Sequence, residues 1–287
     1  MVEDLVRARG PFSLRASTRL VGDATRRFDG RILICAFEVN GGLERAACWQ
    51  ETDGAIALRA LSEEGLERMK AVLPLDADHS EFLRRFADDE LLGRAVRTLR
   101  GKRPLRLGTV THALLRAVCG QLIESKRARR IELRLIRATC ASDGALCAPP
   151  RPEAFCNFAP AELQRFDLSA RKAATIVRLC RTLELERLRE VSPGGAARRL
   201  ERERGLGPWS VGVIGLEGLG CYHFGLVGDL GLIKLCSALL GRRAEPEDTA
   251  ELLAPYGEWQ GLASAYLLAG FAQGLLPVRY DRRPQAA

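Results

Sequence analysis

The strongest constraint on the fold is a change in hydrophobic period near Leu105. Before it, segments rich in β-branched and aromatic residues are separated by turn sequences such as Asn40-Gly41-Gly42. After it, apolar residues recur at helical spacing. Strands carry the first kind of pattern and amphipathic helices the second, so the chain is expected to have an α+β fold. We expect an N-terminal antiparallel sheet domain over residues 1–100, followed by an all-helical domain over residues 101–287.

The elements on each side of this change have expected bounds. Strands are expected at residues 12–21, 30–39 and 46–61. Ser62 begins a sequence that resembles a capping box at the start of a helix. Further helices are expected at residues 80–86, 88–99, 111–120, 125–138, 193–202, 208–216, 230–240 and 259–274, with one more capped by Ser169 and a loop at 143–153.

The composition is that of a folded intracellular protein. Hydrophobic residues make up 47% and charged residues 28% of the 287 residues, as in ordinary globular chains. No apolar run reaches the length of a transmembrane helix, and the N-terminus lacks the order of a secretory signal. The nine cysteines form no C-x-x-C pair, so buried, reduced thiols are expected rather than a zinc or iron–sulfur site.

Positive charge is concentrated in one segment. The formal net charge is +8, and residues 94–137 hold thirteen Lys or Arg against two Glu, an excess of eleven. The rest of the chain is therefore slightly acidic. Such a concentration is typical of a protein that binds a polyanion. A solvated basic face, or a helical interaction protein with acidic partners, is the alternative explanation.

The most informative segment is the run from Arg204 to Ser210, Arg-Gly-Leu-Gly-Pro-Trp-Ser. A helix is expected to end at Gly205, and Gly207-Pro208 is expected to begin the next helix. Because neither glycine has a Cβ, a phosphate can approach the exposed backbone N–H groups. The preceding segment is helical and not a strand, which excludes a dinucleotide-binding loop. A turn without a ligand, and a hairpin that grips DNA without chemistry, both stay open.

A second motif follows downstream of the hairpin. Residues 228–232, Gly-Asp-Leu-Gly-Leu, put Asp229 at the start of another expected helix, 22 residues after Gly207. Together with residues 113–122, 168–173 and 259–264, these motifs resemble the helix-hairpin-helix DNA glycosylases, most closely the bacterial 3-methyladenine DNA glycosylase II type. The resemblance extends from about residue 105 to 277 and covers the N-terminal part more loosely.

The resemblance implies that Asp229 is a catalytic carboxylate for base excision. The N-glycosidic bond breaks through an oxocarbenium-like state, whose charge a carboxylate stabilises while it orients water. An N-cap of the helix is the alternative role for Asp229, and one residue can serve both. Trp209 stands where bifunctional members carry a Schiff-base lysine. The resemblance therefore implies a monofunctional enzyme that hydrolyses the bond and leaves an abasic site.

Other residues acquire roles from the same resemblance. Trp209 and Phe271 would face a cationic, alkylated base, in a pocket where Val213 replaces an aromatic residue of a relative. Core packing is the alternative for both aromatic residues. Leu122, with Gln121, would fill the gap left by a flipped base, and an ordinary core position is the alternative for Leu122. Phosphate binding is implied for Gly205, Gly207, Ser210 and Lys172, with Arg171 as a further candidate.

Departures from the family pattern affect the substrate and the cofactors. Arg204 stands where a proline is usual, and Gly228 replaces a second acidic residue. We expect alkylated bases of the 3-methyladenine and 7-methylguanine type, with deaminated or oxidised bases, or DNA binding without catalysis, as alternatives. Only Cys236 follows Asp229, so no iron–sulfur cluster is expected. The backbone carbonyls of Arg204 and Leu206 are a candidate site for Na⁺ or K⁺.

The resemblance also suggests the partners and the location of the protein. We expect a monomer that binds double-stranded DNA with damaged bases and has no membrane partner. We expect it in the bacterial cytoplasm, associated with the nucleoid through DNA.

Overall fold

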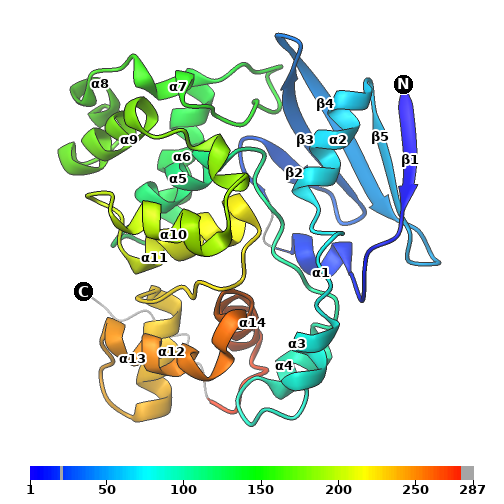
Figure 1. The fold of residues 1–287 in the computed structure, drawn as a ribbon, viewed down its shortest axis with the longest axis vertical. Coiled ribbons are helices and arrows are strands. Elements are labelled where there is room, and N and C mark those ends of the chain that lie inside the picture. Colours follow the sequence, from blue (N-terminus) through cyan, green and yellow to red (C-terminus); the bar gives the residue numbers. More distant parts are fainter. Residues whose placement is uncertain (20–21, 279–287) are drawn as a thin grey trace.

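The strands of the N-terminal part form one antiparallel sheet in the order β1-β5-β4-β3-β2. In the computed structural model, which describes residues 1–19 and 22–278, this sheet lies beside a larger group of helices (Figure 1). Alternate residues of β3, including Leu33, Cys35 and Phe37, are buried on one face of the sheet. The strands are β1 (Val2–Val6), β2 (Arg26–Phe28), β3 (Ile32–Val39), β4 (Gly42–Gln50) and β5 (Ile56–Ala60).

Helix α2 (Glu63–Val72) packs on this sheet (Figure 1). Ser62 caps it, since its Oγ accepts the Gly65 N–H at 3.1 Å, and this part of the prediction is confirmed. The reciprocal half of the predicted capping box is wrong, because the Ser62 N–H donates to Glu44 of β4 and not to a glutamate of the helix. The missing Cβ of Gly65 makes room for the Glu44 carboxylate.

The strand predicted at residues 12–21 is wrong. Helix α1 (Leu14–Thr18) occupies this segment, with Ser13 as its N-cap. The Thr18 hydroxyl donates to a carbonyl of the preceding turn at 2.7 Å. Short polar side chains that bond to the backbone locally favour such a turn over a strand. Residues 20 and 21 of the predicted strand lie outside the described residues.

The long strand predicted at residues 46–61 is two strands. A turn with Gly54 at φ +86° separates β4 from β5, and these strands pair with each other. Strands β1 and β2 were not predicted. The predicted strand at residues 30–39 corresponds to β3.

Most of the predicted helices are present with ends that shift by a few residues. Helix α12 has the predicted bounds, whereas α4 is shorter than predicted and the segment 208–216 divides into α11 and the π-helix η2. None of the helices in the described ranges combines the length and apolarity needed to span a bilayer. The helices after α2 are α3 (Ser80–Arg85), α4 (Gly93–Thr98), α5 (Val110–Gly120), α6 (Ser125–Thr139), α7 (Glu153–Cys156), α8 (Pro160–Gln164), α9 (Ala170–Thr182), α10 (Pro193–Glu201), α11 (Pro208–Val213), α12 (Leu230–Leu240), α13 (Pro246–Leu253) and α14 (Gln260–Gln273), with the short turns η1 (Glu186–Arg189), η2 (Ile214–Leu219) and η3 (Ala254–Trp259).

Two clusters of buried apolar side chains form the interior. One lies between the sheet and α2, and the other fills the helical part. Phe82 of α3 and Val96 of α4 belong to the helical cluster, and both helices lie near α14 (Figure 1). The division of the chain at residue 100 stays a prediction. All nine cysteines are free, and all but Cys140 and Cys156 are buried, as expected for structural thiols.

A buried ionic network around Arg116 of α5 ties the sheet to the helices. Its guanidinium donates to Asp23, which precedes β2, to Glu132 of α6 and to Glu217 of η2. Burial is the largest single influence on the Glu132 carboxyl and would raise its pKa, but the Arg116 charge and the interactions with His112, taken together, lower this pKa to about 2. Asp23, His112 and Glu132 lie close enough together to ligate a metal ion. The Arg116 guanidinium already bonds to both of these carboxylates, which makes the cluster an ion-pair network.

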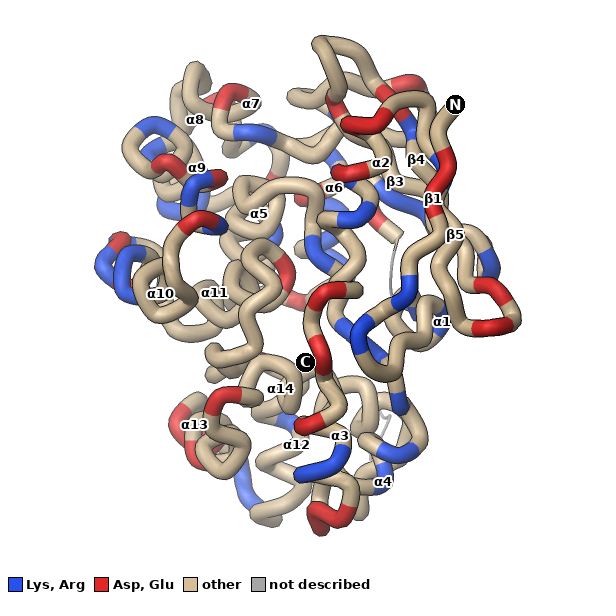
Figure 2. The backbone as a smooth tube through the Cα atoms, turned by 45° about the vertical axis from the view of Figure 1, so that its right-hand side comes forward, with Lys and Arg blue, Asp and Glu red and all other residues tan. Residues whose placement is uncertain are grey.

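The basic segment of residues 94–137 does not form one surface, contrary to the simplest interpretation of its charge. Its helices α4 and α6 lie in different parts of the molecule (Figure 2). Arg103 and Arg116 are buried, and Arg103 donates to the Pro74 carbonyl at 2.6 Å. Part of the positive charge therefore holds the interior together. Lys126, Arg127, Arg130, Arg134 and Arg137 of α6 are exposed.

Candidate active site at the hairpin

The predicted hairpin joins α10 to α11 and packs against α9. Gly205 has φ +93°, and a Cβ on it would lie 2.6 Å from Thr175 Oγ1 of α9. Both the left-handed backbone and the close approach therefore require glycine at this position. Gly207 is exposed, and open space lies where its Cβ would be. The outer side of the hairpin is thus accessible to a ligand.

A cavity of about 1130 Å³ lies beside the hairpin. Its walls come from the α5–α6 turn, the start of α9, the hairpin, residues 227–228 and α13. Val213 and Phe271 do not line it; both are 6% exposed and belong to the helical core. Their predicted pocket roles stay predictions. The predicted site residues that do line the cavity are Gln121, Leu122, Arg171, Lys172, Gly205, Leu206, Gly207, Trp209 and Ser210.

Asp229 is the N-cap of α12, next to the cavity residue Gly228. Its Oδ1 accepts the Gly231 and Leu232 N–H groups at 2.8 and 3.3 Å. Its Oδ2 accepts the indole N–H of Trp209 at 3.0 Å. Asp229 therefore caps α12 through Oδ1. Its Oδ2 lies against Trp209, which lines the cavity. The catalytic role stays a prediction.

The loop that carries Asp229 is held by two helices. The Gly228 N–H donates to Thr249 Oγ1 of α13 at 2.8 Å, and the Leu226 N–H donates to Ser264 Oγ of α14 at 3.1 Å. The sequence analysis did not predict α13. The first residue of this helix, Pro246, lines the cavity. A proline at the first helical position, followed by acidic residues, is the signal that predicts such a helix start.

Trp209 is half-buried and forms part of the cavity wall. A Cβ on Gly120, the last residue of α5, would lie 2.6 Å from its ring, so the absence of a side chain there makes room for the indole. The ring thus lies between the end of α5 and Asp229. Position 209 offers an aromatic surface and one N–H donor, but no primary amine.

Leu122 stands at the tip of the α5–α6 turn. Its side chain is 94% exposed, and its backbone is left-handed with φ +56°. An ordinary core position, the alternative considered for this leucine, is therefore wrong. A non-glycine residue in this region of backbone space is strained, and such strain is often found at functional positions. The intercalating role stays a prediction.

Gln121 and Lys172 both have partners inside the molecule. The Gln121 amide donates to the Gly205 carbonyl at 2.8 Å and to Ser210 Oγ at 3.0 Å. The Lys172 ammonium donates to the carbonyls of Cys119 and Gln121 at 3.1 and 2.7 Å, and burial lowers its pKa. These two side chains connect the turn that carries Leu122 to the hairpin and to α9. A contact of either side chain with DNA would have to form beside these internal hydrogen bonds or replace one of them.

The candidate cation site at the hairpin carbonyls has a competitor. The Arg204 carbonyl accepts an N–H of Arg178 at 2.6 Å, and Arg178 also pairs with Glu203 at 2.6 Å. A monovalent cation at the same carbonyl would be repelled by this guanidinium. The residues present at Arg204 therefore do not fit Na⁺ or K⁺.

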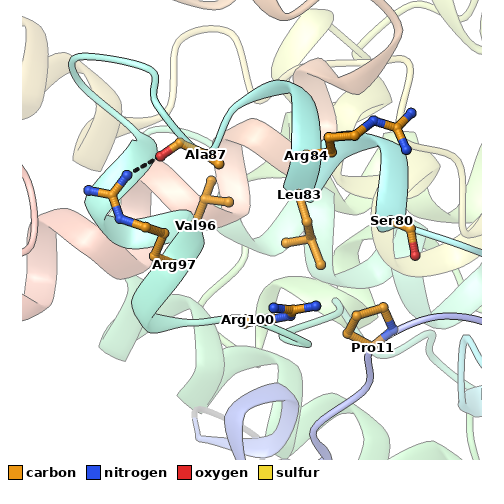
Figure 3. Close-up of a pocket in the computed structure, with 8 residues that line it drawn as sticks. All are labelled: Pro11, Ser80, Leu83, Arg84, Ala87, Val96, Arg97 and Arg100. Atoms are coloured by element: carbon orange, nitrogen blue, oxygen red, sulfur yellow. Dashed lines mark hydrogen bonds between the residues drawn. The ribbon is translucent and has the colours of Figure 1, made fainter.

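A separate cavity of about 520 Å³ lies between α3, α4 and the segment before α1 (Figure 3). Arg84, Arg97 and Arg100 line it together with apolar side chains such as Leu83, and Arg97 donates to the Ala87 carbonyl. None of its lining residues belongs to the candidate active site.

Comparison with known proteins gives one curated relative and several similar structures. The chain is 25% identical over 219 residues, 71% of each chain, to a DNA-3-methyladenine glycosylase of Bacillus subtilis (strain 168). Its fold resembles that of a 3-methyladenine DNA-glycosylase from Archaeoglobus fulgidus, with a TM-score of 0.80, 19% identity and coverage of 94% of this chain and 98% of that one. It also resembles an 8-oxoguanine glycosylase/lyase of Clostridium acetobutylicum in complex with duplex DNA, with a TM-score of 0.74, 16% identity and coverage of 94% and 95%.

No family model matches the sequence. The similarities nevertheless extend over most of the chain, since the curated relative covers 71% of it and the Archaeoglobus fulgidus structure covers 94%. The hairpin and Asp229, which caps α12, agree with these similarities. In sequence and in fold the chain is therefore similar to DNA glycosylases of the helix-hairpin-helix superfamily.

Proposed function

We propose that this DNA glycosylase is monofunctional and removes alkylated purines, of the 3-methyladenine and 7-methylguanine type, from duplex DNA. The observation that carries the proposal is the hydrogen bond from Trp209 to Asp229 at the edge of the cavity. It supports a site in which an aromatic ring faces the base and a fixed carboxylate faces the sugar. The name of the Bacillus subtilis relative agrees with this substrate class.

In the proposed reaction the damaged nucleotide leaves the stack and its base lies against Trp209. An alkylated purine carries positive charge, which an electron-rich ring attracts. As the N-glycosidic bond breaks, its electron pair leaves with the base, which becomes neutral without gaining a proton. The sugar becomes cationic, and the Asp229 carboxylate stabilises that charge. Water then adds to the anomeric carbon and loses a proton, which yields an abasic site.

The exposed Leu122 supports the step in which the base is flipped. A wedge of this kind fills the gap in the stack and keeps the flipped nucleotide from returning. Leu122 has a left-handed backbone, its side chain is exposed, and it lines the cavity.

Release of an oxidised base is the second candidate function. The likeness in fold to an 8-oxoguanine glycosylase/lyase favours it. Such a base is neutral and leaves as an anion unless it is protonated, so a fixed carboxylate alone helps it less than it helps a cationic base. The absence of an amine at Trp209 also argues against a lyase.

Identification of the released base tests the proposal. The protein is incubated separately with methylated, 8-oxoguanine-containing, deaminated and undamaged duplexes, and free bases are measured by mass spectrometry. Release of 3-methyladenine and 7-methylguanine is the expected result. Release of 8-oxoguanine or hypoxanthine instead would replace the substrate class, and no release from any duplex would support a DNA-binding protein without catalysis.

A further inference from the structure

Arginines make up half of the residues that line a second cavity next to the hairpin. It has a volume of about 590 Å³ and lies between α9 and the hairpin, with Arg171, Arg178 and Arg204 in its walls. It shares Arg171 and Gly205 with the larger cavity of the candidate active site. The two cavities therefore adjoin each other across the hairpin backbone.

The three arginines of this second cavity differ in their partners. Arg178 pairs with Glu203 and donates to the Arg204 carbonyl, so it fastens the hairpin segment to α9. The side chains of Arg171 and Arg204 are exposed, and neither has a hydrogen-bond or ion-pair partner within residues 1–19 and 22–278. Two unpaired guanidinium groups beside one cavity repel each other, and an anion between them would relieve that repulsion.

We propose that Arg171 and Arg204 bind a backbone phosphate of DNA that neighbours the phosphate at the hairpin. Guanidinium groups present a planar fork of donors that matches two oxygens of a phosphate. DNA is favoured over other anions because the cavity shares Gly205 with the hairpin, so a strand that crosses the hairpin backbone passes directly beside it. The inference rests on the proposed function only in taking duplex DNA as the ligand.

Arg204 adds a positive charge at the rim of the hairpin, and no acidic side chain among the described residues pairs with it.

The salt dependence of duplex binding tests the site. Each neutralised phosphate contributes about −0.9 to the slope of log K against log salt, so wild type with three to six contacts should show a slope of roughly −3 to −5. Because both arginines are proposed to bind the same phosphate, the double variant Arg171→Gln, Arg204→Gln should reduce the magnitude of the slope by about 1, and each single variant should reduce it by less. Arg204→Lys keeps the charge and should retain most of the slope, which separates the loss of a phosphate contact from misfolding.

The matched control uses the arginines of the cavity in Figure 3. Arg84→Gln with Arg100→Gln makes the same change in net charge at a distant cavity and should leave the slope as in wild type. If this control lowers the slope as much as the hairpin pair does, the effect is one of total charge and the proposed site is wrong. An unchanged slope in the Arg171→Gln, Arg204→Gln variant also overturns it.

Base release is a separate readout that distinguishes the two proposals. If wild type releases no base but the hairpin pair still reduces the slope, the phosphate site stands and the proposed function fails. If wild type releases methylated bases while the slopes stay equal, the phosphate site alone is wrong.

Discussion

The indole N–H of Trp209 donates to Asp229 Oδ2 at 3.0 Å, while Oδ1 of the same carboxylate accepts two backbone N–H groups of α12. All three donors are neutral. Within the described part of the chain no lysine or arginine pairs with this carboxylate. Its orientation is therefore fixed while its charge stays unpaired, which is the arrangement needed to stabilise a cationic sugar.

Asp229→Asn should reduce base excision by roughly 10³-fold, because an amide lacks the charge that stabilises the oxocarbenium-like state. The amide oxygen can still accept the Gly231 and Leu232 N–H groups, so the helix cap should be kept. Single-turnover release of 3-methyladenine measures the loss, and binding to undamaged duplex should persist. Near-normal excision by this variant would falsify the assignment of Asp229.

Trp209→Phe should slow excision by on the order of tenfold. It keeps an aromatic surface for the base but deletes the N–H that orients the carboxylate, and a hydrogen bond to a charged group contributes about 1.5 kcal/mol or more. Single-turnover rates at saturating protein give the comparison.

Trp259→Phe is the matched control for this substitution. The Trp259 indole N–H is buried without a partner among the described residues, and it does not line the active-site cavity. The control should excise at the wild-type rate. Equal rates for the Trp209 and Trp259 variants would show that the hydrogen bond to Asp229 does not matter for catalysis.

The contrast between Asp229 and Gln121 shows what the sequence could predict. The hairpin and the cap at Asp229 depend on residues a few positions apart, so local rules find them. The direction of the Gln121 side chain depends on the Gly205 carbonyl and the Ser210 hydroxyl, more than 80 residues away in sequence. Pattern alone cannot supply such a contact.

Helix packing decides the position of Phe271, whereas local hydrogen bonds and packing together decide that of α1. Phe271 has a spacing that fits a pocket residue, but its helix turns it into the core. The segment predicted as a strand at residues 12–21 has the composition of a strand. It forms α1 because Ser13 and Thr18 bond to the local backbone and Leu14 packs under the sheet.

Lys172→Met should impair base flipping. Its ammonium holds the Cys119 and Gln121 carbonyls just before Leu122, and a leucine with φ +56° needs such support. We expect flipping, followed by the fluorescence of 2-aminopurine beside the lesion, to slow by on the order of tenfold.

A phosphate contact for Lys172 predicts a different result. It would reduce the salt slope of binding by about 1 and leave the flipping rate nearly as in wild type. Lys234→Met, an exposed lysine on α12, is the control for removal of one ammonium group.

His79 should make stability depend on pH. It is 2% exposed, its ring nitrogens have no partner in the described residues, and burial lowers its pKa from 6.5 to about 3. Because the unfolded chain takes up the proton first, the stability present above pH 6.5 is lost as the pH falls toward 3. Between about pH 6.5 and pH 4.5 the free energy of unfolding should fall by about 2 kcal/mol from this group.

His79→Phe isolates this effect. The ring keeps the edge-on packing against Tyr222 but cannot take up a proton. Urea unfolding of both proteins at each pH gives the difference, in which the acid titration of carboxyl groups cancels. Parallel curves for the two proteins would contradict a titrating His79.

Borohydride should trap no covalent adduct between wild-type protein and lesion-containing DNA. A glycosylase/lyase uses an amine to form an imine with the sugar, and the position that would carry it is Trp209, whose indole nitrogen is occupied by Asp229. The product should be an abasic strand that breaks only after alkali or heat. Lys234 lies five residues beyond Asp229 on α12 and is exposed, so it is the amine to examine. Five residues correspond to about 140° around a helix, which directs Lys234 away from the sugar that Asp229 faces. If an adduct forms with wild type, the enzyme is not monofunctional, and its disappearance in Lys234→Ala would identify the nucleophile.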